Sequence, residues 1–340
     1  MAYTTIKKPS DYFNTKLYSG NGSTQNITGL DFQPDWVWIK ERTSTSDNML
    51  FDAVRGATNR VESNTTDSEA LSPNQLTAFN SDGWTTGNSA GTNESGQTYA
   101  SWNWLANGTG VANTDGSISS TVSANTTSGF SIATYTGNGT SGSTIGHGLT
   151  SVPSMIITKR TDSANGWGVY HQSLGTGKEL YLNYDNSEQS SNFWITTPTT
   201  SVFSVSSSDY VNLNNATYVA YCFADVQGYS KFGSYVGNGS TDGTFVYTGF
   251  KPAFIIQKNA STGSTNWQIF DNKRNDFNVV DDYLIVNSSG AEGVSTSLDF
   301  VSNGFKIRQS AGYINTSGDT YIYMAFAEEP LVGDNPATAR

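Results

Sequence analysis

Cysteine, histidine and charged side chains are scarce in this sequence of 340 residues. The single cysteine, Cys222, excludes an intrachain disulfide, and the chain lacks the Cys/His spacing of a zinc site. No apolar run approaches the roughly 20 residues that a membrane helix needs. The first residues, MAYTTIKKPSDYF, contain no apolar stretch of the kind found in secretory signals. We therefore expect a protein made in a reducing cytoplasm, without metal, cofactor or membrane insertion.

Charged residues make up 14% of the chain, against about 25% in a typical soluble domain. The formal net charge is -11, and a negative surface repels phosphates, so we expect no nucleic-acid partner. Runs of Ala, Leu, Glu, Lys or Arg that would favour helices are missing. A heptad pattern is missing too, which argues against a coiled-coil shaft.

Glycine, serine, threonine and asparagine take the place of the charged residues. Aromatic residues reach 13%, with 18 Tyr, 17 Phe and 8 Trp, whereas disordered chains are poor in aromatics. Strands favour β-branched and aromatic residues, and turns favour Gly and Asn. The composition therefore predicts a folded, all-β protein with many turns.

Three sequence markers recur in the same order three times. Each copy begins with Tyr-x-Gly-Asn-Gly, continues with a proline, an apolar run and a lysine, and closes with an aromatic strand. The first marker spans 18–22, 135–139 and 235–239, the second spans 34–40, 153–159 and 252–258, and the closing strands begin at Tyr99, Tyr218 and Tyr321. The proline precedes the closing tyrosine by 65, 65 and 69 residues. This spacing predicts three diverged copies of a module of about 100 residues.

Each marker has a local structural interpretation. Gly-Asn-Gly is typical of a turn that needs positive φ, and a proline is tolerated at the first residue of a strand. With roughly seven or eight strands per copy, the pattern predicts three tandem, diverged β-sandwich modules of jelly-roll or lectin-like type. The expected boundaries are residues 1–107 for module one with an N-terminal attachment segment, 108–127 for a polar linker, 128–224 for module two, 225–327 for module three and 328–340 for a polar C-terminal tail.

Residues that could carry catalysis are few, and structural roles explain them better. Phe-Asp-x-x-Arg occurs at 51–55 and 270–274, and we interpret both copies as salt-bridged turns. His147 lies in a glycine-flanked turn, and Asp281-Asp282 precedes a strand. A GxSxG nucleophile motif is absent. The sequence therefore predicts no catalytic residue and no metal ligand.

The middle copy departs from the other two. It has Tyr170-His171 where the others have Phe-Asp, and its Trp194 has no counterpart. Trp167 matches Trp267, so we interpret both as core residues. We predict Trp194 and His171 as candidate surface ligand-binding residues.

Several of these motifs resemble those of a known family. The segments are residues 1–40, GFSIATYTGNG, IGHGLTSVPSMIITKR, YVAYCFA and GYSKFGSYVGNGSTDGTFVYTGFKPAF. Over nearly the whole chain, the sequence is similar to marine bacteriophage proteins of cyanophage and pelagiphage type. The resemblance implies a virion structural protein with repeated β-rich domains, often tail-fibre-like, and supplies no catalytic or ligand residues.

Three hypotheses on function follow. The first is a non-enzymatic tail fibre or tail appendage, assembled in the host cytoplasm, released by lysis and located in the virion. It would contact other virion proteins and a host surface glycan or receptor, as a homo-oligomer such as a trimer. The second is a capsid decoration or head fibre protein. The third is a depolymerase of host polysaccharide, for which the sequence offers no paired carboxylates.

Overall fold

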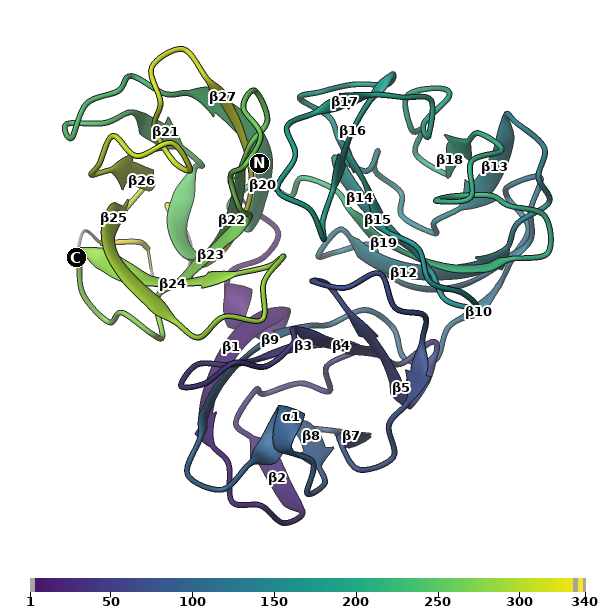
Figure 1. The fold of residues 1–340 in the computed structure, drawn as a ribbon, viewed down its shortest axis with the longest axis horizontal. Helices are drawn as coiled ribbons and strands as arrows, with labels where there is room; N and C mark the ends of the chain where they lie inside the picture. Colours follow the sequence, from purple (N-terminus) through teal and green to yellow (C-terminus); the bar gives the residue numbers. More distant parts are fainter. Residues whose placement is uncertain (1–3, 333–335, 339–340) are drawn as a thin grey trace.

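The computed structural model describes residues 4–332 and 336–338. Within them the chain is all-β, with 27 strands, one short α-helix, α1 (Ala90–Asn93), and one 3-10 helix, η1 (Pro9–Asp11). Figure 1 shows three lobes around a common centre. No helix in the described residues is long and apolar enough to cross a membrane.

Lobe 1 holds a six-stranded sheet and a three-stranded sheet. The order in the large sheet is β1-β9-β3-β4-β5-β6, and in the small sheet β2-β8-β7. The strands are β1 (Phe13–Ser19), β2 (Gln25–Thr28), β3 (Trp36–Glu41), β4 (Met49–Asp52), β5 (Gly56–Glu62), β6 (Ala70–Leu71), β7 (Leu76–Asn80), β8 (Gly83–Thr86) and β9 (Thr98–Trp104).

Lobe 2 holds an eight-stranded sheet and a two-stranded sheet. The large sheet has the order β10-β11-β12-β19-β14-β15-β16-β17, and β13 pairs with β18. The strands are β10 (Val111–Asn113), β11 (Ser120–Asn125), β12 (Phe130–Thr136), β13 (Ser143–Gly146), β14 (Met155–Arg160), β15 (Trp167–His171), β16 (Lys178–Tyr181), β17 (Gln189–Ser190), β18 (Val202–Val205) and β19 (Thr217–Phe223).

Lobe 3 is a single eight-stranded sheet of order β20-β27-β22-β23-β24-β25-β26-β21. Its strands are β20 (Ser230–Val236), β21 (Phe245–Tyr247), β22 (Phe250–Asn259), β23 (Gln268–Asp271), β24 (Val280–Ile285), β25 (Gly293–Val301), β26 (Gly304–Ile307) and β27 (Thr320–Pro330).

The repeated markers occupy equivalent register positions in the three lobes. The closing aromatic strand lies between the strand before Gly-Asn-Gly and the strand after the proline in each lobe, with antiparallel pairing. Phe13 faces Trp104, Phe130 faces Phe223 and Ser230 faces Phe326 across the first of these pairs. Residues can therefore be compared between lobes position by position.

A single hydrophobic core lies where the three large sheets meet. Its aromatic members include Trp36, Trp102 and Trp104 from lobe 1, Phe130, Tyr221 and Phe223 from lobe 2, and Phe232, Phe254 and Phe326 from lobe 3. Trp36 stacks on Tyr221 of the next lobe with ring centroids 4.4 Å apart. Alternation along each strand sends the other face of each sheet into a separate core of its own lobe. The shared core joins the lobes into one body.

The Gly-Asn-Gly turns are held by an asparagine six residues before each closing tyrosine. Its side-chain oxygen accepts a hydrogen bond from the turn's Asn N–H at 2.8–2.9 Å. These asparagines are Asn93, Asn212 and Asn315. The first glycine is required because a Cβ at Gly20 would overlap the Glu94 carbonyl, and the second because Gly22 has a φ of +70°. The turn is thus a packed element of each lobe.

The expected boundaries need three corrections. Residues 108–127, expected to be a linker, contain β10 and β11, and β11 pairs with β12 over six residues. Residues 4–16, expected to be an attachment segment, fold into the body, because Ile6 and Phe13 are buried in the shared core. The expected tail begins inside β27, where Glu328 forms an ion pair with Lys251 at 3.0 Å. Residues 1–3, 333–335 and 339–340 lie outside the described residues.

Candidate functional site

The Phe-Asp-x-x-Arg motifs form salt-bridged turns, as predicted. Arg55 Nε donates to Asp52 Oδ2 at 2.6 Å, and Arg274 Nε donates to Asp271 Oδ2 at the same distance. Each aspartate also accepts the backbone N–H of its arginine through Oδ1. Both ion pairs are almost completely buried, where a charge is tolerated only when it is paired and hydrogen-bonded.

These turns also contact the neighbouring lobe. The hydroxyl of Tyr221 in lobe 2 donates to Asp52 Oδ2 at 2.8 Å. Trp102 Nε1 in lobe 1 donates to Asp271 Oδ2 at 3.1 Å. Tyr221 and Trp102 occupy the same register position in their closing strands. Each aspartate therefore joins its own turn to the closing strand of the next lobe.

His171 replaces the aspartate at the third junction. The donor position of the next closing strand is Met324 in lobe 3, and a thioether cannot donate a hydrogen bond. His171 Nε2 lies 3.2 Å from the Tyr323 carbonyl, while Nδ1 accepts the Ser173 N–H at 3.2 Å. Burial lowers the pKa of His171 to about 4. The neutral imidazole with its proton on Nε2 satisfies both contacts. The histidine of the middle copy therefore matches a partner strand, β27, that has Met324 in place of a hydrogen-bond donor.

A second set of contacts follows the same cycle, and its donors lie on the same side of each junction as Tyr221 and Trp102. Each junction has a side-chain N–H that donates to a backbone carbonyl of the preceding lobe, at 2.9–3.0 Å. The pairs are Asn48 with Ile285, Trp167 with Glu62, and Trp267 with Tyr181. Trp167 and Trp267 are buried, as predicted. The sequence did not identify Asn48 as their equivalent.

The repeated lysines also lie at these junctions. Each ammonium donates to a backbone carbonyl of another lobe: Lys40 to Ser289, Lys159 to Thr66 and Lys258 to Asp185. Burial lowers the pKa of each lysine to about 8. These lysines have 0% exposure, so they bridge the lobes at the junctions and do not contribute a basic surface.

Trp194 and His171 do not form part of the surface, and the prediction for both is wrong in this respect. Trp194 has an exposed fraction of 2% and packs in the core of lobe 2, with its ring 5.8 Å from that of Tyr170. His171 has an exposed fraction of 0%. A residue without a counterpart in the repeat here belongs to the core of lobe 2. His147 is buried as well, and its Nδ1 accepts the Leu149 N–H at 3.1 Å.

The ionisable groups of the described residues offer little accessible chemistry. No group of three or more His, Cys, Asp or Glu side chains lies close enough to hold a metal ion in residues 4–332 and 336–338. Burial raises the pKa of Glu179 to about 7, in the range of a general acid. Its side chain is inaccessible, however, with an exposed fraction of 0%, so substrate cannot reach it in this conformation.

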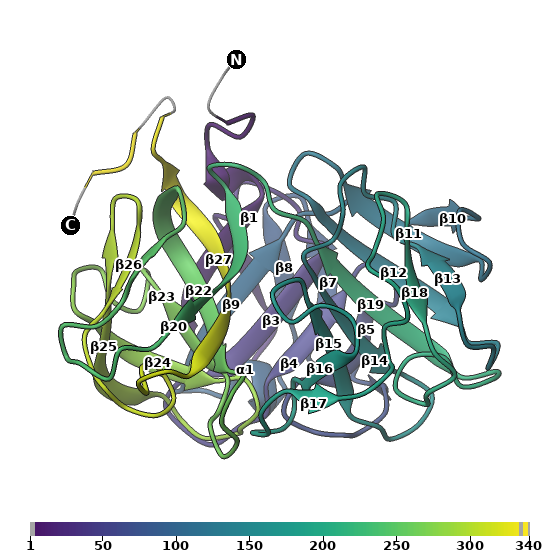
Figure 2. The ribbon, with the colours of Figure 1, turned by 90° about the horizontal axis from the view of Figure 1, so that it is seen from above.

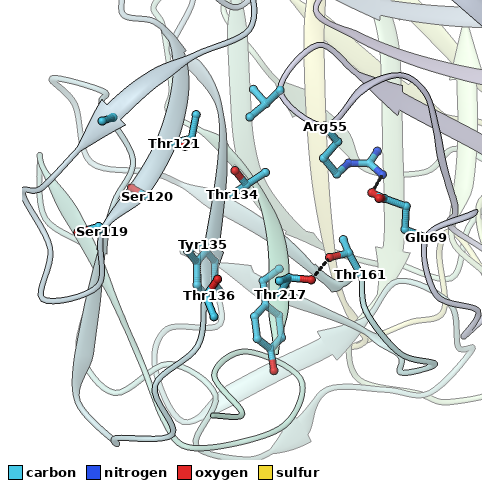
Figure 3. A pocket seen from close by; sticks show the side chains of 13 residues that line it. Arg55, Glu69, Ser119, Ser120, Thr121, Thr134, Tyr135, Thr136, Thr161 and Thr217 are labelled. Carbon is cyan, nitrogen blue, oxygen red and sulfur yellow. Dashed lines mark hydrogen bonds and ion pairs between the residues drawn. The ribbon is translucent and has the colours of Figure 1, made fainter. Parts of the chain in front are cut away.

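A polar groove of about 490 Å³ lies between lobes 1 and 2. We name it the hydroxyl groove, after the side chains that line it: Ser119, Ser120, Thr121, Thr134, Thr136, Thr161 and Thr217. Figure 3 shows Ser119, Ser120 and Thr121 on one side and the Arg55–Glu69 ion pair of lobe 1 on the other, with Thr161 next to Glu69. The Nη1 of Arg55 donates to Glu69 Oε2 at 2.8 Å. Sequence reasoning missed this groove because four of its lining residues come from residues 108–127, which were expected to form a linker.

Comparison with known proteins gives one match. A family model described as a domain of unknown function (DUF7483) matches residues 8–330. No curated protein and no solved structure matches the chain. Because the model spans nearly the whole chain, the protein belongs to the DUF7483 family.

Proposed function

We propose that this protein is a non-enzymatic structural component of a bacteriophage virion, a tail fibre or tail appendage that acts in host attachment. In this proposal the chain is three diverged copies of one β-sandwich-like unit fused around a common core. The sequence resemblance to marine phage proteins motivates the assignment to a virion. The observation that carries it is the use of the repeated polar residues, which hold the lobes together.

The positions of the repeated residues favour a structural role over catalysis. The buried aspartates, lysines and tryptophans form one closed cycle of contacts between lobes. A repeated group that holds the lobes together is needed in every copy, whereas an active site is needed once. Residues that differ between the copies are not needed for these contacts, and we propose that they serve recognition.

The positions of η1 and the end of β27 suit a protein that docks on one side. Figure 2 shows η1 and the end of β27 on one face, and α1 on the opposite face. A virion partner that binds the first face would leave the opposite face and the sides of the lobes open to the host. We propose other virion proteins as the partners at the first face.

Immuno-electron microscopy of purified particles tests this function. Antibodies against the purified protein should label the tail tip or tail side of phage from lysates that contain the chain. Labelling over the head would support a capsid decoration or head fibre protein instead. Particles free of the protein by labelling and by mass spectrometry would refute a virion component. Light scattering on the purified protein tests the expected homotrimer.

A further inference from the structure

The hydroxyl groove has the chemistry of a saccharide site. We infer that it binds a short, neutral oligosaccharide, which deepens the proposed role in host attachment and rests on it for its biological meaning.

The groove exists because lobe 2 has strands that the other lobes lack. β1 and β20 are edge strands of their sheets, whereas their equivalent β12 continues into β11 and β10. Phe130 and Ile132 on β12 pack in the shared core, and Thr134 and Thr136 continue the same face beyond it. Thr121 on β11 pairs with Thr134. The added strands therefore widen this face into a floor beside lobe 1.

The floor presents hydroxyl groups that have no other use. The side chains of Ser119, Thr121, Thr134 and Thr136 make no hydrogen bond to any of the described residues. Thr161 and Thr217 bond to each other at 2.7 Å. A hydroxyl can donate and accept, which matches the hydroxyl groups of a sugar. The threonine methyl groups supply apolar contacts for its C–H faces.

The charge of the groove disfavours an anionic ligand. On the wall, the single guanidinium of Arg55 is paired with both Glu69, at 2.8 Å, and Asp52, which leaves one carboxylate charge in excess. No unpaired cation is therefore available for a phosphate, sulfate or carboxylate. The net charge of -11 repels anionic glycans as well. A neutral oligosaccharide avoids both penalties.

The size and shape of the groove agree with this class. Its volume of about 490 Å³ lies within the roughly 300–1,000 Å³ of small-molecule sites. An extended peptide would instead be expected to pair with the free edge of β10. The hydroxyl groups lie on the face of the sheet, so a ligand that hydrogen-bonds side chains fits better than one that hydrogen-bonds the backbone.

A binding assay with a defined panel tests the inference. The probes are neutral trisaccharides of glucose, galactose, mannose and N-acetylglucosamine in α and β linkages, with sialylated and sulfated trisaccharides as acidic comparators. We expect at least one neutral probe to bind. The double variant Thr121→Val/Thr134→Val keeps shape and strand propensity but removes two hydroxyls, and should weaken that binding at least tenfold.

Two further variants make the result decisive. Thr296→Val, at an exposed position of β25 in lobe 3, should bind as the native protein does. Ala112→Trp, on the exposed β10 rim, should block the groove by filling it. The inference is overturned if no neutral probe binds, if only acidic probes bind, or if the groove variants bind as tightly as Thr296→Val.

The outcome is separable from that of the proposed function. Labelled particles without saccharide binding would leave the virion component standing and remove the groove. Saccharide binding by a protein that is missing from particles would support the groove and remove the virion component.

Discussion

Removal of the Tyr221 hydroxyl tests the junction between lobes 1 and 2. This hydroxyl donates to Asp52 Oδ2 at 2.8 Å and accepts from Arg55 Nη2 at 3.3 Å. Tyr221→Phe keeps the ring stacked on Trp36 and leaves the buried carboxylate one donor short. Hydrogen bonds to charged groups contribute about 1.5–3 kcal/mol, so the free energy of unfolding should fall by about that amount.

The effect on thermal unfolding follows from the size of the chain. An unfolding entropy of about 2.1 cal/mol/K per residue, applied to 340 residues, gives a decrease in Tm of about 2–4 °C. Tyr170→Phe is the matched control, because Tyr170 is also buried, on β15 of the same sheet, and its hydroxyl bonds to none of the described residues. Its Tm should change by less than about 1 °C. Equal shifts in the two variants by calorimetry would refute a special role for the junction hydroxyl.

Three further predictions address the pH dependence and the turns. Because burial holds the pKa of His171 near 4, below its unfolded value of 6.5, the unfolded state binds the extra proton between these values and stability falls on acidification from pH 6.5 to 4. His171→Gln should reduce that fall in urea titrations, and an unchanged pH profile would contradict it. Lys258 has a pKa of about 8 when folded and 10.5 when unfolded, so its charge opposes folding at neutral pH and that cost is relieved as the pH rises from 8 to 10.5. The stability of the native protein relative to Lys258→Met should therefore rise over this window, by at most about 3 kcal/mol, and a fall would reverse the argument. Asn212→Ala removes the side-chain hydrogen bonds that hold the 137–139 turn and should lower the free energy of unfolding by about 1–3 kcal/mol. Asn214→Ala, at an exposed position, is the control and should change it by less than about 0.5 kcal/mol.

The local elements could be predicted from the sequence because their signals are local. Gly-Asn-Gly turns, the strand at each proline and the Asp–Arg turns depend on residues a few positions apart, although Pro252 lies inside β22 and not before it. The asparagines that hold the Gly-Asn-Gly turns carried such a signal too, since each lies six residues before its closing tyrosine. Alignment of the three copies on that tyrosine would have found them.

Contacts between lobes could not be predicted in the same way. Consecutive apolar residues on a strand show that both faces are buried, but they do not show which face meets another lobe. The exchange of aspartate for His171 makes sense only beside Met324, 153 positions further on. Trp194 was misplaced because the absence of a counterpart says nothing about exposure. Residues 108–127 look like a linker because β10 is a short, exposed edge strand and its neighbour β11 is rich in serine and threonine.

The central claim is that three lobes share one core and fold as one body. Differential scanning calorimetry of the intact protein tests it most directly. We predict one transition whose calorimetric and van't Hoff enthalpies agree, because no lobe can unfold without exposing the inner faces of the other two. Two or three resolved transitions, each with the enthalpy of a single lobe, would contradict the shared core.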